Sequence, residues 1–180
     1  MLSQTAKQEL LNISRKTLEE FVENRQIPEV QVENISLHEP RGVFVTLRVK
    51  DQLRGCLGLM IAEDPLWQVV QTQTVAAAVS DPRFESVQPS ELPDVEIEIS
   101  VLSPLKKIDF WKEIKLGQHG VLIKRGPHSG VFLPQVAAET DWDLETFLQN
   151  LCSHKAGLPP DSYKDPMTEI FVFTVEKITG

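Results

Sequence analysis

The order of elements along this chain of 180 residues predicts an α+β fold, a mainly antiparallel sheet flanked by helices. Segments with apolar residues at every second position, typical of strands, alternate with segments whose apolar residues have helical spacing. Short links join several of the strand-like segments, which favours antiparallel pairing because parallel neighbours need a long crossover. The length suits one domain and is sufficient to bury roughly 70% of the surface of the unfolded chain.

The first predicted element is a helix from Thr5 to about Asn24. Apolar residues recur there at helical intervals, with charged residues on the other side. Thr5 and Gln8 have the spacing of a capping box at the start of this helix. The next stretch, from Arg25 to Pro40, contains two prolines and alternates only briefly, so we expect an irregular connection.

Two strands and a second helix follow. Residues 43–50 alternate between apolar and polar, and the polar break Asp51-Gln52 predicts a hairpin into the segment Leu53 to Met60. Asp64-Pro65 predicts a helix start, with Asp64 as the N-cap and Pro65 at the first helical position. This helix runs to about residue 80 and ends in the polar turn Asp81-Pro82-Arg83-Phe84.

Four strands are predicted in the second half of the chain, three of them before residue 135. Val95 to Val101 alternates with glutamates, as in a half-buried strand with one solvated face. Val121 to Lys124 and Val131 to Leu133 are expected to form a hairpin around a moderately long glycine-rich loop, Gly126 to Gly130.

Helical signals in this half are fewer. Asp109 to Ile114 forms at most a short helix, and Asp143 is placed to cap a helix that ends at Lys155-Ala156-Gly157. Cys152 falls on the apolar stripe of that helix, which indicates a core residue. A single last strand is expected from Glu169 to Lys177.

Composition narrows the class of protein. The formal net charge is -8, and the basic residues are scattered, which argues against nucleic-acid binding because that affinity depends on neutralising phosphates. Cys56 and Cys152 lie far apart without a Cys-x-x-Cys spacing, a pattern that fits a reducing compartment. No signal peptide and no membrane-spanning run are evident, so we expect a cytoplasmic protein that does not enter membranes.

The segment around Cys56 carries the chemistry most open to interpretation. In an extended strand, Arg54, Cys56 and Gly58 share one face, while Gly55 leaves a gap between leucines on the other. A neighbouring cation favours the thiolate over the thiol. Two glycines in a strand indicate a bulge or a close backbone approach, and Gly58 leaves room beside the thiol. The alternative is a core strand with a small buried cysteine.

Six motifs together resemble one family, the AMMECR domain family, whose microbial members are called protein A of the AmmeMemoRadiSam system. The motifs are Leu53-Arg54-Gly55-Cys56-Leu57-Gly58, Asp81-Pro82-Arg83-Phe84, Ser100-Val101-Leu102-Ser103-Pro104, Gly117-Gln118-His119-Gly120, Leu133-Pro134-Gln135-Val136 and Lys155-Ala156-Gly157-Leu158. The resemblance covers nearly the whole chain. Leu57 departs from it, since the family more often has isoleucine there, which is a conservative exchange.

The resemblance implies a single intracellular domain over residues 1–180, with a larger lobe from both chain ends, a smaller central lobe and a functional cleft between them. It implies two companions, a Memo-type protein and a radical S-adenosylmethionine protein, and hence a place in a modification pathway. It assigns no biochemical activity.

Two hypotheses about function follow. In the first, the protein is an enzyme or a catalytic subunit that uses Cys56, with His119 as a possible base. In the second, it is a non-enzymatic binding or assembly module that recruits a Memo-type partner, with Arg54 and Arg83 as anchors for anions. Lys155 either joins this ligand-binding set, with Gly55 and Gly58, or only complements a helix dipole.

Other site types have weaker signals. Cys152 and His154 are two residues apart on a helix and do not share a face, and no other histidine or cysteine has metal-ligand spacing, so we expect no metal site. The loop from Gly126 to Gly130 lacks the context of a phosphate-binding loop, and the three tryptophans fit packing better than a cofactor site. The sequence identifies no cofactor, substrate or oligomeric state.

Overall fold

The computed structural model describes residues 1–180, which form two compact units. The larger unit comprises Met1–Leu102 and Glu176–Gly180, and the smaller unit is Ser103–Val175. The larger unit therefore holds both chain ends, and the smaller one is the central part of the chain. Each unit combines helices with a four-stranded sheet, which confirms the predicted α+β fold.

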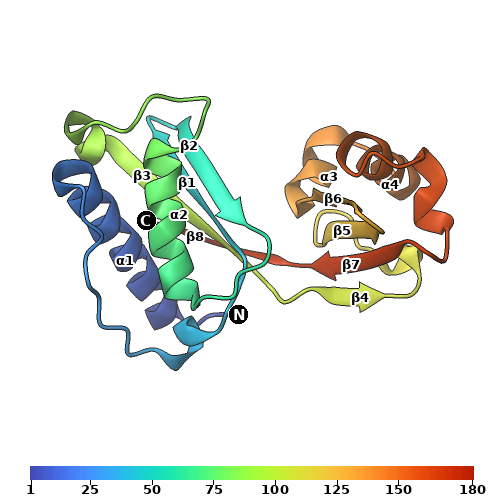
Figure 1. Ribbon diagram of the computed structural model, residues 1–180, viewed down its shortest axis with the longest axis horizontal. Helices are drawn as coiled ribbons and strands as arrows, with labels where there is room; N and C mark the ends of the chain where they lie inside the picture. Colours follow the sequence, from blue (N-terminus) through green and yellow to red (C-terminus); the bar gives the residue numbers. More distant parts are fainter. The chain divides into compact units, whose positions relative to one another are not determined.

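The larger unit contains four strands, two long helices and two short 3-10 helices (Figure 1). Its fourth strand, β8, forms where the chain returns to this unit near its C-terminal end. These elements are α1 (Gln4–Asn24), η1 (Ile35–His38), β1 (Val43–Val49), β2 (Gln52–Leu59), α2 (Leu66–Val79), η2 (Pro89–Asp94), β3 (Val95–Leu102) and β8 (Val175–Thr179). The strand order in the sheet is β2-β1-β3-β8, so β2 lies at an edge. The predicted hairpin is confirmed, because β1 and β2 pair antiparallel.

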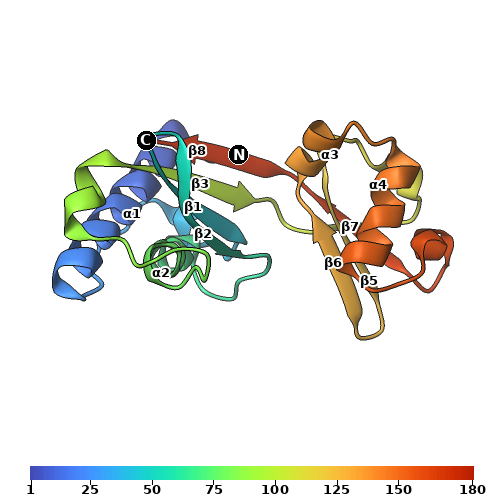
Figure 2. The same cartoon turned by 90° about the horizontal axis from the view of Figure 1, so that it is seen from above.

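Helices α1 and α2 pack against each other and cover one face of this sheet (Figure 2). Val43, Val45 and Leu47 of β1 point to that face and are fully buried in the core that the helices share with the sheet. Since side chains alternate along a strand, Thr46 of β1 points to the opposite face. The alternation seen in the sequence thus separates the core of this unit from a polar face.

Both predicted helix caps in this unit are wrong. The N-cap of α1 is Ser3, whose hydroxyl accepts a hydrogen bond from the backbone N–H of Ala6 at 3.1 Å, so the helix starts before Thr5. The N-cap of α2 is Pro65, and no side chain caps the helix. Asp64 is not needed there, because the N–H of Leu66 donates to a backbone carbonyl on the segment before β1.

The smaller unit contains four strands, two short α-helices and three further helical turns. These elements are β4 (Lys106–Ile108), η3 (Trp111–Glu113), β5 (Gly120–Arg125), β6 (His128–Phe132), α3 (Pro134–Thr140), α4 (Leu144–Asn150), the π-helical turn η4 (Leu151–Lys155), η5 (Pro160–Lys164) and β7 (Glu169–Phe173). The strand order is β4-β7-β5-β6. Asp143 caps α4 through the N–H of Thr146, as predicted, and Cys152 is fully buried in the core, which confirms that prediction.

Several boundaries in this unit differ from the predictions. Arg125 pairs directly with His128, so the β5–β6 turn is Gly126-Pro127 and not a long loop. The strand β4 and the helix α3 were not predicted, because each is too short to show a period. The helix capped by Asp143 changes at Asn150 from an α-helix to the π-helical turn η4.

The predicted strand from Glu169 to Lys177 is two strands that belong to different sheets. β7 pairs with β4 and β5 in the smaller unit, whereas β8 is the neighbour of β3 in the larger one. Thr174 separates them. The N–H of Thr174 donates to the hydroxyl oxygen of Ser103, and the N–H of Ser103 donates to the carbonyl oxygen of Thr174, both at 2.9 Å. Hydrogen bonds therefore connect the segment after β3 with the segment between β7 and β8.

No helix in the structure has both the length and the apolar character needed to cross a membrane.

We predict that Gly55→Ala destabilises the protein by about 2 kcal/mol or more, because a Cβ there would overlap the backbone carbonyl oxygen of Ala77 in α2. The measurement is urea unfolding of the wild type and the variant. Gln52→Ala, at an exposed position of the same strand, is the control and should change stability by less than about 0.5 kcal/mol. Equal midpoints for Gly55→Ala and the wild type would show that α2 does not need this close approach.

Candidate functional site

Cys56 lies in the edge strand β2, and its backbone is held by a side chain from outside the sheet. The only strand next to β2 is β1, so the N–H of Cys56, which points away from β1, has no strand partner. It donates instead to Oδ2 of Asp81 at 2.9 Å. A carboxylate at the end of α2 therefore closes the sheet edge at the position of the cysteine.

Of the two glycines of this strand, only Gly55 has the effect expected from the sequence. Gly58 does not leave room beside the thiol, because a Cβ there would overlap the Phe44 ring and the carbonyl oxygen of Val43, which already fill that space. The register of β2 against β1 shifts so that Gly55 faces Leu47 and Leu53 faces Arg48, which leaves Arg54 in a bulge. Gly55 also provides the close backbone approach to α2. Cys56 then pairs with Thr46 of β1.

The thiol of Cys56 has one hydrogen-bond partner in the structure. The hydroxyl of Thr46 donates to Sγ across the strand pair at 3.2 Å. Cys56 is partly exposed, whereas the other cysteine, Cys152, is fully buried. Burial raises the pKa of the Cys152 thiol above its ordinary value, and a backbone hydrogen bond opposes this. Of the two cysteines, only Cys56 is placed to meet a substrate.

Asp81 connects the backbone of Cys56 to the side chain of Arg83. Its carboxylate accepts from the N–H of Cys56, from the N–H of Arg83 and from the guanidinium at Nε (2.9 Å) and Nη2 (2.7 Å). The side chain of Asp81 is only 2% exposed. The hydrogen bonds from the Arg83 side chain hold the pKa of Asp81 far below its usual range, against the opposing effect of burial. The carboxylate is thus charged and saturated with donors.

Arg83 is the exposed member of this pair. Its side chain is 55% exposed, and the guanidinium carbon lies 5.5 Å from the centre of the Phe84 ring. The hydrogen bonds to Asp81 raise the pKa of Arg83, and burial opposes this. Arg83 therefore presents a charged guanidinium next to the turn that holds the backbone of Cys56.

Arg54, the cation nearest to Cys56 in the sequence, is engaged elsewhere. Its guanidinium forms a bidentate ion pair with the carboxylate of Glu91, with N–O distances of 2.7 and 3.0 Å. Its third nitrogen donates to the backbone carbonyl of Glu85 at 2.8 Å. This pairing with Arg54 is the main cause of the lowered pKa of Glu91. Arg54 thereby ties β2 to η2, and its ligand-binding role stays a prediction.

His119 and Lys155 lie in the smaller unit, whereas Cys56 lies in the larger one. Nδ1 of His119 accepts from the N–H of Lys115 at 3.2 Å, which leaves Nε2 to carry the proton of the neutral ring. Burial, followed by the charges of Lys115 and Lys106, lowers the pKa of His119. The pairing of His119 with Cys56 stays a prediction.

Lys155 ends the π-helical turn and is exposed, with its ammonium 5.9 Å from the centre of the Phe132 ring. Gly130 of β6 packs against the same turn, since a Cβ there would come within 2.7 Å of the backbone nitrogen of Ala156. π-helical turns are frequent at functional sites. A ligand-binding role for Lys155 stays a prediction as well.

Sequence reasoning missed Thr46 and gave Asp81 only a role in a turn. Counting residue pairs outward from the two-residue hairpin turn places Thr46 opposite Gly55, and only the bulge at Arg54 shifts the register so that Thr46 pairs with Cys56. Asp81 is 25 positions from Cys56, and only the packing of α2 on the sheet brings them together. No cluster of three or more histidine, cysteine, aspartate or glutamate side chains in the structure could hold a metal ion.

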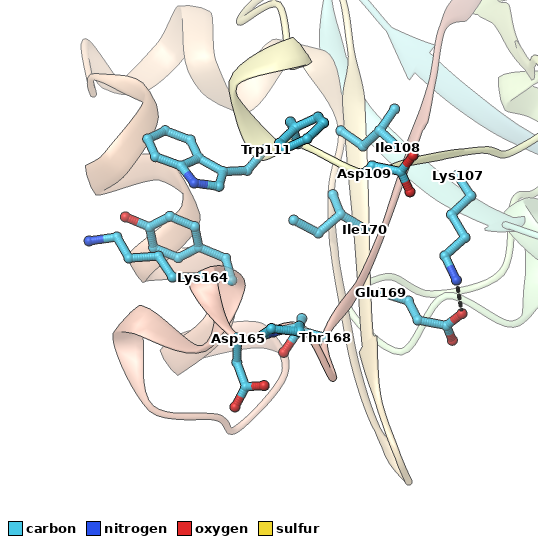
Figure 3. Close-up of a pocket in the computed structure, with 12 residues that line it drawn as sticks. Lys107, Ile108, Asp109, Trp111, Lys164, Asp165, Thr168, Glu169 and Ile170 are labelled. Atoms are coloured by element: carbon cyan, nitrogen blue, oxygen red, sulfur yellow. Dashed lines mark hydrogen bonds and ion pairs between the residues drawn. The ribbon is translucent and has the colours of Figure 1, made fainter.

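The smaller unit has a groove of its own, about 450 Å³ in volume, between the chain that follows β4 and the chain that leads into β7 (Figure 3). Its lining residues are Lys107, Ile108, Asp109, Phe110, Trp111, Tyr163, Lys164, Asp165, Pro166, Thr168, Glu169 and Ile170. Trp111 and Tyr163 meet edge to face, with ring centres 5.3 Å apart. Lys107 and Glu169 form an ion pair of 2.6 Å on the rim, and Phe110 is 72% exposed.

Comparison with known proteins places this architecture in a family. The family model AMMECR1 matches residues 11–178. The chain belongs to the AMMECR1 family. Protein NEQ441 of Nanoarchaeum equitans is 42% identical over 91% of this chain and 94% of its own length, and protein TK0174 of Thermococcus kodakarensis is 42% identical over 93% and 86%.

A solved AMMECR1-family structure has the same fold. The crystal structure of the uncharacterized protein PH0010 from Pyrococcus horikoshii is 36% identical in sequence, with a TM-score of 0.80, and the match covers 94% of this chain and 88% of that one. These matches extend over both units. The names of these relatives state no reaction, so chemistry has to be argued from the side chains around Cys56.

We predict that Asp81→Asn lowers the free energy of unfolding at pH 7 by about 2 kcal/mol, because the carboxylate accepts charged and backbone hydrogen bonds. The pKa of Asp81 is lower in the folded protein than in the unfolded chain. The carboxylate therefore stabilises the fold above the unfolded pKa of about 3.9 and loses this effect as the pH falls below it.

The measurement is urea unfolding of both proteins at pH 7 and at pH 3, where the difference should shrink. Asp94→Asn, at an exposed position, is the matched control and should stay within about 0.5 kcal/mol of the wild type. If Asp81→Asn and the wild type have equal free energies of unfolding at pH 7, this account is wrong. It is also wrong if the difference between them is as large at pH 3 as at pH 7.

Proposed function

We propose that this AMMECR1-family protein is a component of a modification pathway and that the thiol of Cys56 is its reacting group. The observation that carries the proposal is the hydrogen bond from the Thr46 hydroxyl to Sγ, on a partly exposed cysteine whose backbone is tied to the Asp81–Arg83 pair. A hydroxyl donor and a nearby guanidinium both stabilise a thiolate, which is the nucleophilic form of cysteine.

The reaction class is nucleophilic substitution at an electrophilic carbon. The sulfur of Cys56 forms a bond to that carbon, and the leaving group departs with the electron pair of the bond that breaks. Thr46 donates to the charged sulfur, and Asp81 keeps the strand in place while this happens. His119 is the proposed base. Nε2 carries the proton of the neutral ring, so the nitrogen that accepts the thiol proton is Nδ1, which gives up its hydrogen bond from the N–H of Lys115 to do so.

The proposed companions are a Memo-type protein and a radical S-adenosylmethionine protein in the cytoplasm. The support for them is the resemblance of the sequence motifs to the microbial members of the family. In this arrangement the AMMECR1-family protein contributes a nucleophile, and its companions contribute chemistry that cysteine alone does not perform.

The test of the thiol is residue-resolved alkylation of the folded protein by iodoacetamide, followed by mass spectrometry between pH 6 and pH 9. We expect Cys56 to react in the folded protein and Cys152, which is fully buried, to stay protected. Thr46→Val should slow the reaction of Cys56 about fivefold at pH 7, since it removes a hydrogen bond worth about 1 kcal/mol. His119→Ala should slow it further if His119 is the base.

The control for folding of the larger unit in every variant is an unchanged urea-unfolding midpoint, and Cys152 reports the folding of the smaller unit. If Cys56 reacts only after the protein unfolds, it is a packing residue, and the proposal fails. Once a substrate is known, Cys56→Ser should abolish turnover.

The second candidate function is a non-enzymatic binding module that recruits the Memo-type protein. The observation that favours it is the groove of the smaller unit, where Phe110 is 72% exposed beside the aromatic pair Trp111 and Tyr163. An exposed aromatic side chain beside a groove is typical of protein interfaces.

This candidate predicts that Phe110→Ala weakens binding of a purified Memo-type protein at least tenfold, because aromatic anchors carry much of the binding energy of an interface. The measurement is calorimetric titration of the two purified proteins. Ile35→Ala, at another exposed apolar side chain, is the matched control and should bind like the wild type. A complex whose activity survives Cys56→Ser favours the module, and the absence of binding contradicts it.

A further inference from the structure

The two arginines near Cys56 differ in what they can still bind. The side chain of Arg54 is 17% exposed, and each of its three nitrogens donates within the protein. Arg83 is 55% exposed, and its Nη1 has no hydrogen-bond partner in the structure. Of the two, Arg83 is the one with donors available to a ligand.

Arg83 is also held in one orientation. Asp81 accepts from its backbone N–H, its Nε and its Nη2, and the ring of Phe84 lies beside the guanidinium. A side chain fixed in this way loses little conformational entropy when it binds a ligand. Asp81 occupies the edge of the guanidinium formed by Nε and Nη2. The edge formed by Nη1 and Nη2 is left for a second bidentate hydrogen-bond acceptor.

The charge distribution of the pair favours an anion as that partner. Asp81 neutralises Arg83 in total charge, but its side chain is 2% exposed and the guanidinium is 55% exposed. The end of the pair that a ligand meets is therefore the positive one. A planar carboxylate matches the guanidinium fork in shape and charge.

A single oxygen atom links Arg83 to the backbone of Cys56. Oδ2 of Asp81 accepts from the N–H of Cys56 and from Nη2 of Arg83. Glu98, which lies across β1 from Cys56 and pairs in register with Thr46, is balanced by Lys177 at 3.3 Å. The positive charge of Arg83 is thus the one presented beside the cysteine.

We propose that Arg83 binds a carboxylate group of the substrate whose electrophilic carbon reacts at Cys56. This inference rests on the proposed function of Cys56 and adds the substrate class, a small molecule or side chain with a carboxylate close to the reacting carbon. Asp81 is a positioning residue in this scheme, since it acts through Arg83 and through the backbone of Cys56.

The experiment compares two alkylating reagents that differ in charge, iodoacetate and iodoacetamide. In both reactions the sulfur of Cys56 forms a bond to the CH₂ carbon, and iodide leaves with the electron pair of the carbon–iodine bond. The ratio of the two rates at Cys56 reports the preference for a carboxylate, because the intrinsic reactivity of the thiol cancels. A unit charge about 6 Å away in water changes this ratio about threefold.

We expect Arg83→Gln to lower the ratio of the iodoacetate rate to the iodoacetamide rate at Cys56 about threefold. The double variant Asp81→Asn with Arg83→Gln is the matched control, because it has the net charge of the wild type without the guanidinium. The ratio should stay low in the double variant. Arg83→Lys, which keeps the charge, should retain part of the preference. A cooperative urea-unfolding transition above the conditions of the assay shows that the larger unit of each variant is folded.

The outcomes separate the two proposals. If Cys56 does not react with iodoacetamide in the folded wild type, the proposed function fails. If Cys56 reacts but Arg83→Gln leaves the ratio unchanged, only the carboxylate site is overturned. If the double variant returns to the wild-type ratio, the effect comes from the uncovered Asp81 carboxylate, which also overturns the carboxylate site.

Discussion

The hydrogen bonds of the Asp81 carboxylate are the constraint on which the arrangement around Cys56 depends. β2 is an edge strand, and an open edge leaves backbone N–H groups without partners. Asp81, at the end of α2, supplies the acceptor for Cys56 and at the same time orients Arg83. One side chain therefore completes the sheet edge and sets the charge beside the thiol, so stability and chemistry are coupled at this position.

The different surroundings of the two arginines follow from the backbone. The bulge takes Arg54 out of the pairing with β1, and its side chain reaches Glu91 in the 3-10 helix η2. Arg83 sits in the turn after α2, where Asp81 is two residues away and Phe84 is adjacent. The same residue type is thus a structural tie at one position and an exposed, oriented cation at the other.

The smaller unit offers a different kind of surface. Most of the charged side chains that line its groove are in ion pairs, such as Lys107 with Glu169 and Asp165 with Arg125, so a partner would meet mainly the exposed aromatic ring of Phe110. The proposed roles of the thiol in one unit and of the groove in the other are compatible within one AMMECR1-family protein, because they use separate side chains.

The sequence by itself determined the α+β class, the hairpin of β1 and β2, the glycine close approach in β2, the Asp143 cap and the burial of Cys152. Each depends on local periodicity or on neighbours within a turn, and the family resemblance depends on short motifs. The tertiary structure alone decided that Asp81 meets Cys56 and that Arg83, not Arg54, keeps free donors, since these contacts join segments 25 and more residues apart. It also divided Glu169 to Lys177 between two sheets, because alternation shows which face of a strand is buried but not which sheet the strand joins.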